Sequence, residues 1–195
     1  RKGYEVSALE LADANIAAFK KKLTPEDKID LVQGNALDLS RYADKSFDIV
    51  LLFGPLYHLK NDVDKQKCIS EAKRVCKDGG KIFFAFISND FVFLTEFGYD
   101  VNYFSNGDYD KETFKLNDFP FVFHTVGAAR KLLADGGINI LHEVASDGAS
   151  ELLAARINEM SDEDYTQYLR YHFYICEKPE LLGMTNHLLF MGEKK

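Results

Sequence analysis

The stretch FDIVLLFGPLYHLK, residues 47–60, contains the main information about the fold. Residues 47–53 are apolar apart from one aspartate, which is typical of a central parallel strand covered on both faces. The run breaks at Gly54-Pro55, and Tyr57 and His58 follow at once. We therefore expect a buried strand that ends in a turn carrying a phenol and an imidazole.

Alternating strand and helix patterns surround this stretch. The periodicity predicts strands over 5–10, 29–34 and 81–88, and helices over 11–23 and 61–77, with a short helical or irregular link at 36–42. Strands separated by helices indicate βαβ units with right-handed crossovers. The fold class is therefore α/β, a doubly wound, Rossmann-like and mostly parallel sheet.

The second half of the chain is less regular at first. Residues 89–123 are rich in Phe, Tyr, Asn and Asp without a clear period, which is typical of a lid or a binding insertion. The patterns then predict a helix over 125–135, a strand over 138–146, helices over 148–159 and 161–176, and a last strand over 186–193. We expect one domain over 1–195.

Composition narrows the classes of partner. A net charge of −7 with scattered lysines argues against nucleic acid and membrane surfaces and favours a small-molecule ligand. Cys68, Cys76 and Cys176 lack metal-ligand spacing, which suggests free thiols, and no metal site is predicted. No apolar run reaches the roughly 18 residues that span a bilayer, and no signal peptide is seen, so we expect a cytoplasmic protein.

Polar residues stand where two predicted strands end. Ligands of open α/β sheets bind at the carboxyl ends of the strands. Glu10 ends the strand 5–10, where a carboxylate can accept both ribose hydroxyls or simply begin the next helix. Asn35 follows the strand 29–34, where it can meet an adenine edge or fill a turn. Each residue alone is ambiguous.

Taken together, these segments resemble the class I S-adenosylmethionine-dependent methyltransferases. The matching pieces are EVSALEL, QGNALDL, FDIVLLFGPLYHL, the helix running into EAKRVCKDGGKIFFAF, and NHLLFMGEK, which is similar to the family's antiparallel last strand. The resemblance implies S-adenosylmethionine as cofactor and methyl transfer to a small-molecule acceptor through oxygen or nitrogen.

The resemblance also implies site residues. Glu10 would hold the ribose, Leu11 would pack on the adenine, and Asn35 with Ala36 would meet its edge. Phe53 and Gly54 would line the methionine part, and the floor between cofactor and acceptor would run from Pro55 to His58 through Tyr57. The family's glycine-rich first strand and turn are absent, so we expect a strand and helix before Arg1-Lys2-Gly3, which reads as the end of a helix.

Chemistry at such a site depends mainly on positioning, with a base only where the nucleophile must lose a proton. His58 is the candidate base and Tyr57 the candidate orienting group; alternatively the pair caps the following helix or packs beneath the site. His124 follows the insertion and is a candidate for the acceptor pocket. The aromatic cluster Tyr168, Tyr171, His172 and Tyr174 predicts core packing or a homodimer contact.

Two rival functions stay open. A nicotinamide-dependent oxidoreductase would share Glu10 but would not predict an antiparallel last strand, so the order of the sheet separates the two. A methyltransferase-like module without activity, serving binding or assembly, would share the whole fold. The aromatics of 89–123 suggest an apolar or aromatic acceptor, and their collapse onto the core is the equal alternative.

Overall fold

A small parallel sheet opens the computed structural model, which describes residues 3–195. Strand β1 (Val6–Glu10) pairs in parallel with β2 (Ile29–Gln33), and helix α1 (Asp13–Lys22) connects them. The expected helix end at Arg1-Lys2-Gly3 lies mostly outside the described residues; within them, Gly3 adopts a φ of +82°. The first βαβ unit is thus where the sequence predicts it.

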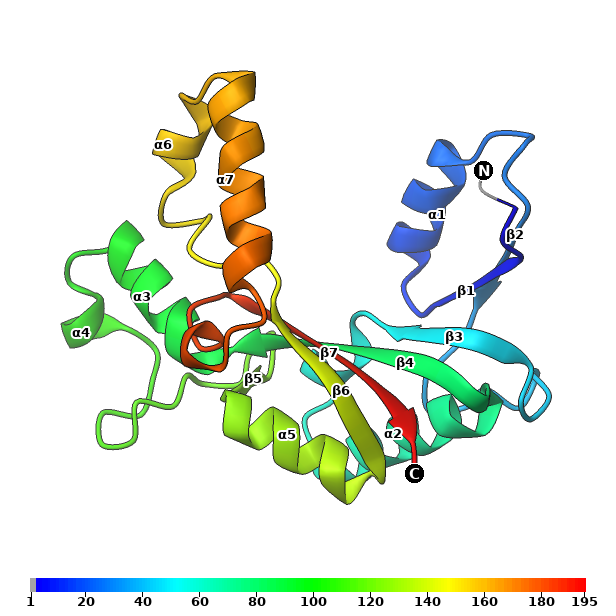
Figure 1. The fold of residues 1–195 in the computed structure, drawn as a ribbon. Coiled ribbons are helices and arrows are strands. Elements are labelled where there is room, and N and C mark those ends of the chain that lie inside the picture. Colours follow the sequence, from blue (N-terminus) through cyan, green and yellow to red (C-terminus); the bar gives the residue numbers. More distant parts are fainter. Residues whose placement is uncertain (1–2) are drawn as a thin grey trace.

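The main sheet has the strand order β3-β4-β7-β6, with β5 paired to β4 (Figure 1). Strands β3 (Phe47–Leu52), β4 (Cys76–Ser88) and β5 (Phe123–His124) are mutually parallel. Strand β7 (His187–Lys194) runs antiparallel to both β4 and β6 (Ile138–Ala145). The predicted antiparallel last strand is therefore confirmed, and so is the mostly parallel α/β class.

Two helices cover one face of this sheet. Helices α2 (Asp62–Val75) and α5 (Val126–Asp135) begin at the N-caps Asn61 and Thr125, whose side chains accept backbone N–H groups three residues on. Their apolar faces bury the aromatic centre of the sheet, and the fully buried members include Ile69, Leu133, Phe84, Phe86, Leu188 and Phe190. Each such side chain contributes about 1.5–3 kcal/mol through its burial.

The opposite face of β3 corrects one expectation. A strand with both faces covered was predicted, yet Ile49, Leu51 and Phe53 are 56%, 58% and 55% exposed. Within residues 3–195, β3 pairs with β4 on one edge, and β1 and β2 form a sheet of their own. The apolar run was therefore a correct sign of residues that prefer burial, but it did not show what covers them. Among residues 3–195, only the face of β3 that packs on α2 is covered.

The segment 89–123 corrects a second expectation. It contains a regular helix, α3 (Asn89–Tyr99), which begins at the N-cap Ser88, and a short helix α4 (Tyr103–Asn106). Phe93, Tyr109 and Leu116 form a small core of their own in this segment. Apolar residues occupy several faces of α3, because Phe91 and Phe93 are buried while Leu94 and Phe97 are not, and the helical period was hidden for that reason.

A second insertion stands beside α3 and α4. Helices α6 (Ala154–Asn158) and α7 (Asp162–Ile175) lie between β6 and β7 and rise from the same end of the sheet (Figure 1). The start of α7 is as predicted, since Ser161 accepts the backbone N–H of Asp164 at 3.1 Å. Tyr171 and Tyr174 are exposed, so the prediction that they pack in the core is wrong. A dimer contact through them stays a prediction. A short 3₁₀ helix, η2 (Pro179–Leu181), precedes β7.

Cys68, Cys76 and Cys176 are free and buried, as expected, and burial raises the pKa of the Cys68 thiol to about 12. No helix among the described residues has both the length and the apolar character needed to cross a bilayer.

Candidate active site

The first predicted site residue, Glu10, ends β1 next to the end of β2. Glu10 lies opposite Gln33, and its backbone carbonyl accepts the N–H of Gly34 at 3.0 Å. Its Oε1 accepts the backbone N–H of Ala12 at 2.8 Å, just before α1. The helix-terminal interpretation of this acid is thus seen directly, while ribose binding stays a prediction that requires the remaining lone pairs of the carboxylate.

Leu11 follows Glu10 and exposes 64% of its surface. The amide of Gln33 fixes this turn by donating to the Leu11 carbonyl at 3.3 Å and to Asp13 Oδ1 at 2.9 Å. An exposed leucine on a fixed turn is suited to pack against the flat face of a ring.

Asn35 and Ala36 begin the loop after β2. The Asn35 side-chain oxygen accepts the backbone N–H of Leu37 at 2.9 Å, which is the turn-filling role expected as one alternative. This bond engages the oxygen of the amide and leaves its NH₂ group as a donor. The structure therefore keeps both interpretations of Asn35 compatible.

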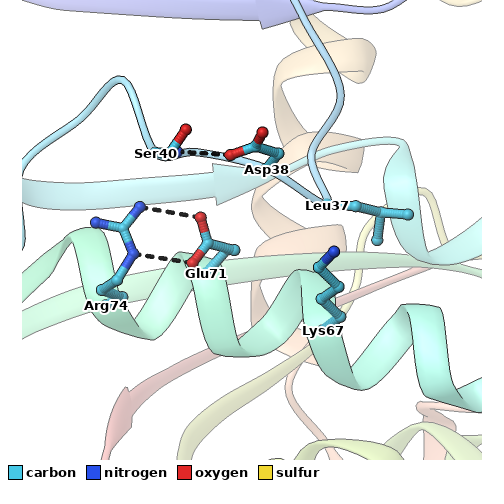
Figure 2. A pocket seen from close by; sticks show the side chains of 6 residues that line it. All are labelled: Leu37, Asp38, Ser40, Lys67, Glu71 and Arg74. Atoms are coloured by element: carbon cyan, nitrogen blue, oxygen red, sulfur yellow. Dashed lines mark hydrogen bonds and ion pairs between the residues drawn. The ribbon is translucent and has the colours of Figure 1, made fainter.

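Arg74 of α2 holds the same loop in place (Figure 2). Its guanidinium donates to the carbonyls of Leu39 and Tyr42 at 2.8 and 2.9 Å and to the Glu71 carboxylate at 2.8 Å. Glu71 in turn accepts the Leu39 N–H at 2.7 Å, and the Arg74 hydrogen bond lowers the pKa of the Glu71 carboxyl. The pocket of about 370 Å³ at this place is thus built around a structural clamp.

The turn after β3 begins at Gly54, whose φ of +148° and ψ of −58° favour glycine. Pro55 then starts a 3₁₀ helix, η1 (Pro55–Tyr57), whose Leu56 is fully buried in the core. Phe53, just before the turn, is 55% exposed. The apolar strand and the turn are both as predicted, and Leu56 anchors the turn between them.

Tyr57 and His58 lie at the end of this turn against the insertion. The His58 ring is 5.2 Å from Phe121 and 5.1 Å from Tyr57, measured between centroids, and the Tyr57 carbonyl accepts the N–H of Val122 at 2.9 Å. Burial raises the pKa of the Tyr57 phenol. His58 is exposed, and among residues 3–195 no hydrogen bond orients its ring. A base role for His58 remains a prediction without an orienting partner.

His124 lies in β5 and is buried, whereas a residue that contacts the acceptor is expected to be accessible. Its ring packs 5.0 Å from Phe86, the residue is 6% exposed, and neither ring nitrogen has a partner among the described residues. Burial lowers the pKa of His124 to about 4, so the imidazole is neutral near pH 7. Contact with the acceptor stays a prediction for His124.

The strand-end residues form two groups on separate sheets. Glu10, Leu11, Asn35 and Ala36 lie together at the ends of β1 and β2, while Phe53, Gly54, Tyr57 and His58 lie at the end of β3. The first group offers a carboxylate, an amide NH₂ and an exposed leucine, and the second an exposed phenylalanine beside a glycine turn.

One pair of residues was missed at the level of the sequence. Asp147 follows β6 and His187 begins β7, and the two side chains form a hydrogen bond of 2.7 Å. The rule that singled out Glu10, a polar residue after the carboxyl end of a strand, also selects Asp147, but not His187, which begins β7. Their pairing itself depends on the antiparallel arrangement of β6 and β7.

Comparisons with known proteins bear on this site. A family model described as a methyltransferase domain matches residues 1–84. These residues include the ends of β1, β2 and β3 and the turn at Gly54. Over these residues the chain is similar to methyltransferase domains.

Individual curated relatives are methyltransferases too. The chain is 33% identical over 100 residues to a demethylmenaquinone methyltransferase of Clavibacter sepedonicus, a match that spans 51% of this chain and 39% of the relative. A methyltransferase relative from Encephalitozoon cuniculi is 40% identical over 52 residues, which are 27% of this chain and 24% of the relative. The chain therefore spans well under two thirds of the curated relatives that it matches.

Solved methyltransferase structures share the fold. A protein from Methanosarcina mazei superposes with a TM-score of 0.59 at 16% identity, covering 99% of this chain and 83% of that one. A protein from Thermotoga maritima gives a TM-score of 0.57 at 15% identity, covering 96% and 72%. Both are described as S-adenosylmethionine-dependent methyltransferases, and at this identity the likeness concerns the fold alone.

Proposed function

We propose that the protein transfers a methyl group from S-adenosylmethionine to the oxygen or nitrogen of a small-molecule acceptor. The observation that carries this proposal is the series Glu10, Asn35 and Gly54 at the ends of the successive strands β1, β2 and β3, together with the antiparallel last strand β7 of the main sheet. The antiparallel β7 disfavours the nicotinamide-dependent alternative, which does not predict it. The similarity of residues 1–84 to methyltransferase domains supports the choice.

In this proposal the chain's own residues bind and orient. Glu10 holds the ribose hydroxyls, Leu11 covers the adenine, and Asn35 with Ala36 meets its edge. Phe53 and Gly54 line the methionine part, and Pro55 with Tyr57 borders the acceptor. S-adenosylmethionine supplies an activated methyl group on a sulfonium, so the remaining task of the protein is to place a nucleophile in line with it.

The two insertions are proposed to cover the acceptor. Both insertions begin at the edge of the sheet where β4 and β6 end. Hydrogen bonds join them, since Tyr99 of α3 donates to Glu151 at 3.0 Å and Thr95 donates to Asn186 at 3.0 Å. Phe93 and Tyr109 are buried, which supports the collapse of part of the aromatic set, whereas Phe97 and Phe104 stay 40% and 47% exposed. These exposed rings favour an apolar or aromatic acceptor.

Isothermal titration calorimetry of the full-length protein with S-adenosylmethionine and with S-adenosylhomocysteine tests the proposal. We expect saturable binding of both, weakened in Glu10→Ala and unchanged in Glu26→Ala, an exposed acid in the turn between α1 and β2 and outside the proposed contacts. Absence of binding at millimolar cofactor would support the inactive binding module instead. Release of S-adenosylhomocysteine in the presence of phenol, catechol and amine probes then measures transfer itself.

A further inference from the structure

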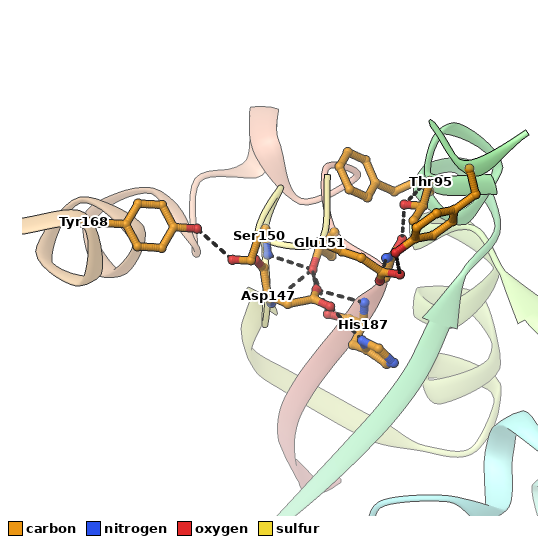
Figure 3. Close-up of polar contacts among 11 residues, drawn as sticks. Thr95, Asp147, Ser150, Glu151, Tyr168 and His187 are labelled. Carbon is orange, nitrogen blue, oxygen red and sulfur yellow. Dashed lines mark hydrogen bonds and ion pairs between the residues drawn. The ribbon is translucent and has the colours of Figure 1, made fainter. Parts of the chain in front are cut away.

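A histidine and a carboxylate form an oriented pair at the base of the two insertions (Figure 3). His187 Nδ1 lies 2.7 Å from Asp147 Oδ2, and the same carboxylate accepts the backbone N–H of His187 at 3.1 Å. The Asp147 side chain is 29% exposed and that of His187 is 57% exposed. The carboxylate is thus the inner member and the imidazole the outer member of the pair.

The position of Asp147 is fixed by its own neighbours. The fully buried Thr185 donates to the Asp147 carboxylate, and its hydroxyl oxygen accepts the backbone N–H groups of Asp147 and Gly148 at 3.2 and 3.1 Å. Ser150 donates to the Asp147 carbonyl and contacts the Tyr168 hydroxyl at 2.7 Å. A carboxylate that accepts from Thr185 and from the His187 backbone, on a backbone held by Ser150 and Thr185, can fix both the tautomer and the direction of the imidazole.

The pair lies at the edge of the sheet where the proposed site is. His187 is opposite Ile87, one residue before β4 ends, and β4 and β3 are parallel neighbours. Leu188 is buried in the core beneath α2 and α5, so strand alternation directs His187 to the other face of the sheet. In Figure 3 the His187 ring extends away from the polar network that holds Asp147.

We propose that His187, oriented by Asp147, accepts the proton that the methyl acceptor loses; this rests on the proposed function. A carboxylate only accepts hydrogen bonds, so the neutral ring carries its proton on Nδ1 and leaves Nε2 free. The lone pair of the acceptor's oxygen or nitrogen forms the new bond to the methyl carbon, the carbon–sulfur electron pair goes to sulfur, and the O–H or N–H proton goes to Nε2.

The contrast with His58 supports this assignment. The His58 ring is bounded by the aromatic rings of Tyr57 and Phe121, and no carboxylate among residues 3–195 orients it. The charged groups that act on His187 are Asp147 and Glu151, both acidic, and the Asp147 hydrogen bond raises the pKa of His187. His187 therefore has the orienting partner that a general base requires, and His58 does not.

His142 provides a matched control. It is another exposed histidine paired with a carboxylate, since its Nδ1 lies 2.8 Å from Glu177 Oε2 with both side chains about half exposed. It lies within β6, three residues before the end of that strand, and outside the proposed site.

The experiment uses the full-length protein and two readouts. Nitrogen-15 NMR of the histidine rings measures the tautomer and pKa of His187 in the wild type and in Asp147→Asn. Methyl transfer to phenol, catechol and amine probes gives kcat and its pH profile for His187→Gln, Asp147→Asn, His58→Gln and His142→Gln. Calorimetry with S-adenosylhomocysteine checks cofactor binding in each variant, and thermal unfolding checks that each variant is folded.

We expect the Nδ1–H tautomer of His187 in the wild type and a lower His187 pKa in Asp147→Asn. The acidic limb of the pH profile of kcat should therefore move to lower pH in that variant. In His187→Gln we expect kcat to fall by about 10²-fold or more with unchanged cofactor affinity, whereas His142→Gln behaves as the wild type. The Nε2–H tautomer, or a His187→Gln enzyme with wild-type kcat, would overturn the role. Failure of the wild type to bind the cofactor would instead overturn the proposed function.

Discussion

His187 Nδ1 lies 2.7 Å from the Asp147 carboxylate, although the two residues belong to different segments that bracket the whole second insertion. The pairing raises the pKa of His187 and lowers the pKa of Asp147, the hydrogen bond between them acting against the effect of burial in each case. The pair therefore links the stability of the insertion to pH.

The sign of this linkage follows from the two directions. The lowered pKa of Asp147 gives stability that is present above its ordinary pKa and is lost as the pH falls, and the raised pKa of His187 gives stability that is present below its ordinary pKa and is lost as the pH rises. The contribution of the pair is thus largest between about pH 4 and pH 6.5. Thermal unfolding of wild type and Asp147→Asn across this range should show the largest difference near the middle, whereas His142→Gln should show a small one.

Glu10→Ala should weaken the binding of S-adenosylmethionine by about 1–3 kcal/mol, since hydroxyls that lose their carboxylate partner stay unpaired. Calorimetry measures this change. Glu26→Ala removes a negative charge from the exposed turn between α1 and β2 and should leave the affinity nearly unchanged. Equal affinities for Glu10→Ala and the wild type would remove Glu10 from the cofactor site.

Gly54→Ala should lower the free energy of unfolding by about 1–3 kcal/mol, because a side chain is strained at a φ of +148°. Space is not the obstacle, since an added Cβ would meet only the Tyr57 hydroxyl at 3.9 Å. Gly127→Ala is the control, because it lies in α5 and should stabilise by about 0.5–1 kcal/mol. Urea unfolding measures both, and a neutral Gly54→Ala would show that the turn relaxes.

Arg74→Leu should release the loop 37–44 from α2, since the guanidinium bonds two of its carbonyls and the Glu71 carboxylate. We expect the midpoint of thermal unfolding to fall by several degrees. Arg41→Leu breaks a surface ion pair of 3.4 Å with Asp30 and should change the midpoint by about one degree or less. Similar midpoints for the two variants would contradict the clamp.

His124 should make the protein less stable as the pH falls. Its folded pKa of about 4 is below the ordinary value of 6.5, so its contribution is present above pH 6.5 and is lost as the pH falls toward 4, by up to about 3 kcal/mol. His124→Phe keeps a ring against Phe86 and removes this dependence. Urea unfolding of both proteins at pH 7 and pH 4.5 measures the difference, and parallel losses of stability would exclude His124 as the cause.

Much of the fold was predictable from local patterns. The strand from Phe47 onward, the turn at Gly54-Pro55 and the helix capped by Ser161 follow from periodicity, turn residues and caps, which act over a few residues, whereas the antiparallel direction of the last strand was expected from the family resemblance. Glu10, Asn35 and Gly54 could be chosen as candidates from the sequence, because each is placed by the end of the strand before it. Helix α3 was missed because aromatic residues lie on several of its faces and hide its period.

Outside the segment 89–123, the sequence by itself determined the order of strands and helices and most of the residues at their ends, since these depend on interactions between near neighbours. Only the tertiary structure decided that the α2 side of β3 is covered while Ile49 and Leu51 are exposed, that His124 is buried without a hydrogen-bond partner among the described residues, and that Asp147 meets His187. These facts depend on which distant segments pack together, and hydrophobic periodicity carries no information about the identity of the partner.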